Sequence, residues 1–327
     1  QNSISVFSKI KQNRRKQTMT KNNTMQGHLA AFLTIFIWGT TFISTKVLLR
    51  SFSPIEILFI RFFIGYAALW IGYPHRKRKG ERKQELYFAL AGLCGVTLYF
   101  LLENIALTLT YASNVGVIIS IAPFFTAIFS FLLKKEEKPG KRFFLGFLMA
   151  MAGICLISGF GGLNPLGDLL AVGAAVLWAV YSLLTRKISD FGYPVVQATR
   201  RTFFYGLVFM IPALFLMDFH VDPRLFLEPA NAGNLLFLGF GASALCFVTW
   251  NYAVRVLGSI KTSVYIYMVP VVTTVTSALI LGEKITMLSA AGILLTLGGL
   301  FLSQKWGKAE GDSSREAEEN GAAGERL

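Results

Sequence analysis

The sequence predicts an all-α membrane protein with ten transmembrane helices, arranged as two inverted five-helix repeats. Three observations lead to this prediction. The chain is 54% hydrophobic and only 15% charged, whereas soluble domains carry about 25% charged residues. From Gly27 onward, apolar runs of roughly 20 residues recur, which is the length that a helix needs to cross a bilayer. These runs also match one another in two successive blocks of the chain.

The apolar runs predict helices because a backbone in lipid must satisfy its own hydrogen bonds, as a helix or as a closed barrel. The stretches 143–157 and 290–302 show none of the two-residue alternation that barrel strands require. The ten predicted spans are 27–49, 53–73, 85–107, 112–133, 141–159, 167–186, 194–217, 233–255, 260–281 and 287–305.

The net charge of +14 would suit a nucleic-acid partner, but the positions of the charges exclude that interpretation. Of the 32 Lys and Arg residues, 25 lie in the tails and loops on one side of the predicted membrane, against Arg50, Arg224 and Lys284 on the other. Basic loops stay in the cytoplasm. We therefore expect both termini to be cytoplasmic and the protein to be a multi-pass protein of the plasma (inner) membrane.

The chain divides into four regions. Residues 1–26 form a basic tail, within which Met19 or Met25 is a candidate translation start. Residues 27–159 and 160–306 form the first and second repeats of five spans each. Residues 307–327, rich in Glu, Gly, Ala and Ser, are expected to be a disordered tail.

The repeat is visible as pairs of equivalent residues. At an offset of 140 residues, Trp38 corresponds to Trp178, Pro54 to Pro194 and Arg61 to Arg201; at an offset of 147, further pairs are Asn104 with Asn251, Pro123 with Pro270 and Glu136 with Glu283. An odd number of spans in each unit places the second unit upside down relative to the first. Inverted repeats are typical of secondary transporters, which bind their substrate between the repeats near the middle of the membrane.

The repeated residues also carry a resemblance to a family. In the first half they are the segments 38–42 and 103–107 with Pro54, Arg61, Pro123 and Glu136, and in the second Trp178, Pro194, Arg201, Asn251, Pro270 and the segment 281–284. This pattern resembles the EamA-type transporters of the drug/metabolite transporter (DMT) superfamily, over residues 27–306. The segment 134–137 departs from the Leu-Gly-Glu of the second copy. The resemblance implies a ten-helix bundle that exports or exchanges amino acids, metabolites or toxic compounds.

Candidate site residues are polar or aromatic residues inside the predicted spans. Those expected to line a substrate cavity are Trp38, Tyr99, Glu103, Asn114, Trp178, Tyr181, Trp250, Asn251 and Tyr265. Ionisable residues inside a bilayer are costly and therefore mark function or ion pairing; here they are Glu103, Lys46, Arg61 and Arg201. Pro123 and Pro270 interrupt equivalent helices and are candidate hinges.

Each of these assignments has an alternative. Glu103 is a proton or substrate-amine site, the partner of Lys46 in an ion pair, or simply a residue exposed to the outer vestibule. Arg61 and Arg201 either bind an anionic substrate group or anchor helix ends through backbone carbonyls. The aromatic residues either line the cavity or pack within the bundle, and the two prolines are structural kinks or gates.

The predicted function is a secondary transporter of small organic solutes (an amino acid, a metabolite or a drug), most simply an exporter working by alternating access with possible proton coupling. We expect no enzymatic activity, cofactor or metal, because no phosphate-binding loop, zinc motif or clustered histidines occur. The expected partners are the substrate and the lipid bilayer, with the oligomeric state open. The alternatives are a channel and a membrane scaffold or sensor without carrier activity.

Overall fold

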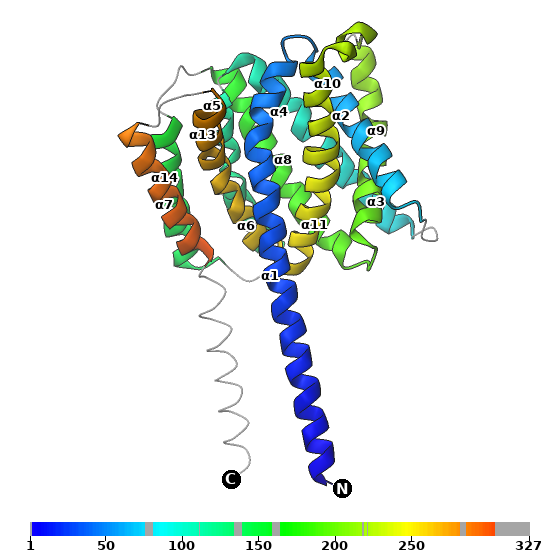
Figure 1. Cartoon of the computed structure of the whole chain (residues 1–327), viewed down its shortest axis with the longest axis vertical. Helices are drawn as coiled ribbons and strands as arrows, with labels where there is room; N and C mark the ends of the chain where they lie inside the picture. The colour runs from blue at the N-terminus through cyan, green and yellow to red at the C-terminus, as the bar shows by residue number, and fades with distance from the viewer. Residues whose placement is uncertain are drawn as a thin grey trace.

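The helices form one bundle, seen from the side in Figure 1. The computed structural model describes residues 2–75, 81–110, 112–133, 139–158, 164–217, 219–220, 222–281 and 286–304; for some of these, including 2–22 and 112–114, it describes the backbone alone. Every regular element in these ranges is helical. The all-α class is therefore confirmed.

The first half of the chain contains α1 (Asn2–Leu48), α2 (Pro54–Gly72), α3 (Arg82–Gly92), the π-helical η1 (Leu93–Leu98), α4 (Tyr99–Leu109), α5 (Ala112–Ile119), α6 (Ala122–Leu132) and α7 (Lys141–Ser158). The second half contains α8 (Pro165–Ser189), α9 (Val195–Leu216), the 3₁₀ turn η2 (Pro223–Leu227), α10 (Pro229–Leu236), the π-helical η3 (Phe237–Leu245), α11 (Cys246–Leu257), α12 (Ser259–Ser263), the 3₁₀ turn η4 (Val264–Tyr267), α13 (Met268–Leu281) and α14 (Met287–Gln304).

Five continuous helical stretches are long and apolar enough to cross a bilayer. They are Asn23–Leu48, Pro54–Gly72, Arg82–Leu109, Pro165–Ser189 and Pro229–Leu257. Large apolar side chains face outward on these stretches, such as Ile71, which is 82% exposed, and on the neighbouring helix α9, such as Phe215, which is 83% exposed. An apolar outer surface of this kind is what a lipid environment requires, so the chain is an integral membrane protein.

The N-terminal helix is longer than its predicted span. The span was expected to begin at Gly27, but α1 begins at Asn2 and its N-terminal part projects beyond the bundle (Figure 1). Residues 2–26 contain neither Pro nor Gly, so nothing in the sequence interrupts the helix before the span.

Two predicted spans are not continuous helices. The span at 112–133 divides into α5 and α6, which are separated at Ser120 and Ile121, and Pro123 occupies the first turn of α6. The span at 260–281 passes through η4 before α13, whose first turn contains Pro270. Proline has no N–H to donate to the preceding turn, and its ring collides with the carbonyl four residues back. Each proline therefore lies just after an irregular turn.

Helices of the two halves interleave instead of forming two separate bundles. Helix α8 packs against α3, α4, α5 and α6, while α1 packs against α11 and α13 and α3 packs against α9. The shared core consequently lies between the halves. It is closed around large buried aromatic side chains, including Phe62, Phe203, Phe247 and Trp250.

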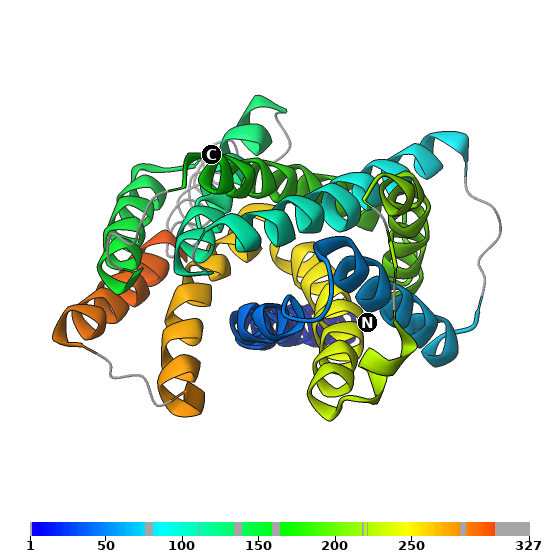
Figure 2. The same ribbon diagram turned by 90° about the horizontal axis from the view of Figure 1, so that it is seen from above.

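Helices α7 and α14 form a close pair at one end of the bundle, where Figure 2 shows them side by side. Their contact depends on small residues. A Cβ atom on Gly146 would lie 2.6 Å from the carbonyl oxygen of Gly299, and one on Gly153 would lie 2.6 Å from that of Gly292. The small residues of these two helices therefore serve packing within the chain.

Candidate functional site

A small buried cavity lies where α1, α2, α4 and α8 meet. Its polar and aromatic lining includes Trp38 and Thr41 on α1, Arg61 on α2, Tyr99 and Glu103 on α4, and Trp178 on α8. Apolar side chains from η4 and α13 complete the wall. Both halves of the chain therefore contribute to one site. The cavity has a volume of about 40 Å³.

Two opposite charges face this cavity. Arg61 is 1% exposed and Glu103 is 5% exposed, and the two groups interact electrostatically. No ion pair within 4.0 Å joins them among the described side chains. Tyr99, one helical turn before Glu103 on α4, lines the same cavity. The cavity thus holds a guanidinium and a carboxyl group that no direct ion pair joins.

Arg61 is held by contacts to both halves of the protein. Its Nε donates a hydrogen bond of 3.1 Å to the hydroxyl of Ser243 on η3. Its guanidinium lies 4.6 Å from the centre of the Phe100 ring and 5.4 Å from that of Phe62, distances at which cation–π attraction operates. Its Nη2 is buried and has no hydrogen-bond partner among the described residues.

Tryptophan side chains from equivalent positions in the two halves meet edge to face at the cavity. The ring centres of Trp38 and Trp178 are 5.1 Å apart and their planes are inclined by 81°. Trp250 lies behind them, 5.3 Å from Trp38 and 5.7 Å from Trp178. Trp38 donates its indole N–H to the carbonyl of Ala242, 3.0 Å away, whereas the indole N–H of Trp178 has no partner among the described residues.

Three other candidates form hydrogen bonds outside the cavity lining. The Tyr181 hydroxyl donates to Asn251 Oδ1 at 2.8 Å, and Asn251 Nδ2 donates to the hydroxyl of Thr199 at 2.9 Å. The Tyr265 hydroxyl lies 2.7 Å from His28 Nδ1, which connects η4 to α1. None of the three is among the residues that line the cavity, and Tyr181 packs against Trp178 of its wall with ring centres 5.0 Å apart.

The position of Lys46 contradicts the ion pair considered for Glu103. Lys46 is exposed and forms no ion pair with Glu103 in the part of the chain that the structure describes. The two residues lie at similar depths in their helices, but Lys46 is on the outward face of α1. The cation that faces Glu103 is Arg61 instead. The side chain of Asn114, another candidate, lies outside the described residues.

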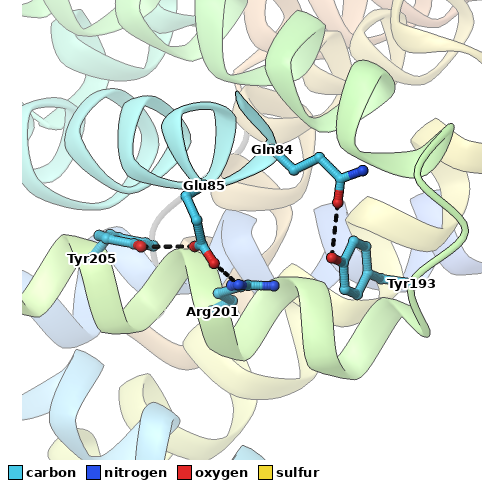
Figure 3. A network of polar contacts seen from close by, with 5 residues as sticks. All are labelled: Gln84, Glu85, Tyr193, Arg201 and Tyr205. Atoms are coloured by element: carbon cyan, nitrogen blue, oxygen red, sulfur yellow. Dashed lines mark hydrogen bonds and ion pairs between the residues drawn. The ribbon is translucent and has the colours of Figure 1, made fainter. Parts of the chain in front are cut away.

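Arg201 belongs to a second polar cluster, which shares no residue with the cavity lining (Figure 3). Its guanidinium forms an ion pair with Glu85 on α3, whose other oxygen accepts a hydrogen bond of 2.7 Å from the Tyr205 hydroxyl. Nearby, the Tyr193 hydroxyl donates to Gln84 at 2.9 Å. We call Gln84, Glu85, Tyr193, Arg201 and Tyr205 the α3–α9 network.

The predicted anchoring of a helix end by arginine occurs at the neighbouring residue, not at Arg201. Arg200 donates to the backbone carbonyls of Tyr73 and His75, at 2.5 and 2.9 Å. Arg61 and Arg201, although equivalent in the repeat, therefore have different partners. Sequence reasoning missed Glu85 as the partner of Arg201. The sequence did contain a signal for this pair. Glu85 lies at the start of one predicted span and Arg201 two turns inside another, and both spans begin on the same side of the predicted membrane.

Metal binding finds no support in the described residues, where no three His, Cys, Asp or Glu side chains are arranged to hold an ion. The three cysteines, Cys94, Cys155 and Cys246, are unpaired. The chemistry that the cavity offers is recognition by charge, hydrogen bonding and aromatic contact.

Comparison with known proteins identifies one family of transporters. The model of the EamA-like transporter family matches residues 25–159 and again 165–304. An uncharacterized transporter of Archaeoglobus fulgidus is 31% identical over 284 residues, covering 84% of this chain and 96% of the relative. A probable terminal-alkyne amino-acid exporter of Streptantibioticus cattleyicolor is 26% identical, covering 84% and 91%. One crystal structure, 22% identical, shares the fold with a TM-score of 0.68, covering 85% of this chain and 96% of the other.

Proposed function

Because the chain belongs to the EamA-like transporter family, we propose that it is a secondary transporter of small organic solutes that works by alternating access. The observation that carries the proposal is the buried cavity between the halves, lined by Arg61, Glu103 and two tryptophans. Membrane interiors tolerate buried charges where they serve a substrate or ion pathway. The cavity is small in this conformation, at about 40 Å³, so it has to widen for an organic solute to enter.

The proposed topology has ten membrane crossings in two inverted repeats, 27–159 and 160–306, with both termini in the cytoplasm of a plasma (inner) membrane. The asymmetry of Lys and Arg between the loops supports the orientation. Beyond the five long apolar stretches, α5 with α6, α7, α9, α12 with α13, and α14 supply the remaining crossings. The tail at 307–327 lies outside the described residues.

In this proposal the substrate binds among Trp38, Tyr99, Glu103 and Trp178, and Glu103 exchanges a proton for it. Tyr181, Trp250, Asn251 and Tyr265 support the wall from behind. The irregular turns before Pro123 and Pro270 are the places where the helices bend as the cavity opens, since these turns lack regular backbone bonds. Export is the proposed direction, in line with the exporter among the relatives.

The α3–α9 network closes the cytoplasmic side in the proposed mechanism. It joins α3 of the first repeat to α9 of the second through the Glu85–Arg201 ion pair. This pair must separate for the cavity to open toward the cytoplasm. A charged contact of this kind re-forms readily on closure, because its groups lie partly exposed, at 24% and 29% for the two side chains.

Trans-stimulation tests the carrier against the channel. Proteoliposomes are loaded with one unlabelled amino acid, metabolite or amphipathic drug at a time, and uptake of the same labelled solute is followed. A carrier with alternating access should show saturable uptake that internal solute accelerates several-fold. Uptake that never saturates for any solute would indicate a channel, and the absence of flux for all of them would favour a scaffold or sensor.

A further inference from the structure

A second pocket, larger than the central cavity, lies between α2 and α9. Its volume is about 230 Å³, against about 40 Å³ for the cavity between the halves. It lies near the end of α2, at Gly72, and the start of α9, at Val195. In the proposed topology this is the cytoplasmic end of both helices. We call it the α2–α9 pocket, and its lining includes Tyr66, Trp70, Gln197, Arg200, Arg201 and Phe204.

Positive charge is concentrated in the α2–α9 pocket. Its described lining contains the guanidinium groups of Arg200 and Arg201 and no carboxylate, although Arg201 also pairs with Glu85 outside the lining. Arg200 is buried, and its hydrogen bonds to the backbone carbonyls of Tyr73 and His75 hold the guanidinium in place without removing its charge. Guanidinium groups fixed in this way are suited to the oxygens of a phosphate.

Aromatic side chains form much of the remaining lining. Trp70 donates its indole N–H to the Tyr66 hydroxyl at 3.1 Å, and the guanidinium of Arg200 lies 4.7 Å from the centre of the Trp70 ring. The rings of Tyr66 on α2 and Phe204 on α9 have centres 6.4 Å apart. Trp and Tyr are enriched at the depth of the lipid headgroups. The pocket therefore has the composition of a headgroup-level site.

Apolar side chains continue from the pocket toward the middle of the membrane. On α9, Val208 and Ile211 follow Phe204 by four and seven residues, which places all three on one face of the helix, and all three are exposed. On α2, the exposed Phe63 precedes Trp70 by seven residues and shares its face. A soluble anion would use the arginines alone, whereas a lipid would also cover these apolar faces.

We propose that the α2–α9 pocket binds an anionic phospholipid of the cytoplasmic leaflet. Its phosphate binds Arg200 and Arg201, and its acyl chains lie along the exposed faces of α2 and α9. Basic pockets between membrane helices on the cytoplasmic side are suited to such headgroups. The site shares no lining residue with the central cavity. The inference uses the proposed orientation in the membrane but does not depend on transport activity.

The test titrates lipids into the purified protein in a maltoside detergent and counts the bound lipids by native mass spectrometry. Phosphatidylglycerol and phosphatidylcholine with identical chains both carry the phosphate, but the choline ammonium cancels the charge of the second lipid. Phosphatidylglycerol should bind at least about tenfold more tightly. Inorganic phosphate and glycerol 3-phosphate, which lack acyl chains, should bind at least about tenfold more weakly than phosphatidylglycerol.

The Arg200→Gln variant assigns this preference to the pocket. Gln keeps N–H donors for the carbonyls of Tyr73 and His75 but has no charge, so most of the preference for phosphatidylglycerol should disappear. Arg142→Gln is the control, because it removes an exposed arginine from α7, on the same side of the membrane in the proposed topology. It should keep the full preference. Thermal unfolding of both variants establishes that they fold.

Photochemical cross-linking locates the lipid in the unaltered protein and needs no variant. A phosphatidylglycerol with a diazirine near its glycerol is added to proteoliposomes of phosphatidylcholine and irradiated. Its adducts should concentrate on peptides from 63–75 and 193–211. Excess unlabelled phosphatidylglycerol should suppress them, and excess phosphatidylcholine should not.

Each opposite result would overturn the lipid site. These results are equal affinity for the two lipids, a preference that persists in folded Arg200→Gln protein, and adducts concentrated on other helices. Binding of inorganic phosphate without any preference between the lipids would assign the pocket to a free anion instead. None of these measurements involves transport, so failure of the lipid site would leave the carrier function standing, and failure of trans-stimulation would leave the lipid site standing.

Discussion

The Glu103→Gln variant is expected to lose the acceleration of transport by a pH gradient. Gln has nearly the same shape as Glu but cannot bind and release a proton. Among the described residues that line the cavity, Glu103 is the one with an acidic side chain. Its carboxyl group is 5% exposed, and an interaction of a charged group at such a buried site is worth about 1.5–3 kcal/mol. We expect gradient-driven flux in proteoliposomes to fall by at least about tenfold.

The control for this variant is Glu81→Gln, which removes a carboxylate outside the cavity. Glu81 is exposed and makes no side-chain capping bond at the start of α3. Its replacement should leave both the flux and the gradient effect unchanged. If Glu103→Gln keeps the full response to the gradient, Glu103 has no part in proton coupling.

The Trp178→Ala variant is expected to be the most destabilised of the cavity substitutions. Trp178 is 2% exposed and packs against Trp38, Tyr99 and Tyr181 at ring-centre distances of 5.1, 4.8 and 5.0 Å. Truncating such a side chain costs about 3–5 kcal/mol through lost burial and the cavity that remains. The free energy of unfolding in detergent should fall by this amount.

A lipid-facing aromatic residue provides the comparison for Trp178. Phe215 is 83% exposed, so Phe215→Ala should change the free energy of unfolding by no more than about 0.5 kcal/mol. Trp178→Phe should lie between the two, because it keeps the aromatic contacts but leaves part of the indole volume empty. Equal losses for Trp178→Ala and Phe215→Ala would contradict the role of the tryptophan cluster as the shared core of the two halves.

The sequence carried enough information to predict the helices and the class of protein. Long apolar runs define where helices lie, because crossing lipid requires them, and the α2 boundaries differ from the predicted span by one residue at each end. The irregular turns near Pro123 and Pro270 also follow from local chemistry. The π-helical η1 does not, since Leu93–Leu98 contains no proline.

The site was predictable only in part, because side-chain direction depends on how each helix is rotated in the bundle. Trp38 and Trp178 were candidates because they are aromatic residues inside predicted spans, and the structure brings them together. Lys46 was considered as the partner of Glu103 because both lie at a similar depth, whereas Arg61 was not. Helix packing turns Lys46 outward and Arg61 inward, which a single sequence does not specify. The Glu85–Arg201 pair likewise depends on the contact of α3 with α9.

Reversible cross-linking of the α3–α9 network tests alternating access most directly. Glu85→Cys and Arg201→Cys are combined in a background where the native cysteines Cys94, Cys155 and Cys246 are replaced by alanine and transport persists. A bis-maleimide with a cleavable disulfide spacer then joins the two positions across the halves. Each single cysteine variant, treated with the same reagent, shows whether modification alone impairs transport.

The proposed mechanism predicts that the joined protein stops exchanging solute and that reduction of the spacer restores exchange. Such a result would mean that α3 and α9 must separate in every transport cycle. Undiminished trans-stimulated exchange in fully cross-linked protein would contradict the mechanism, because the solute would then cross without any opening between the two halves at this end.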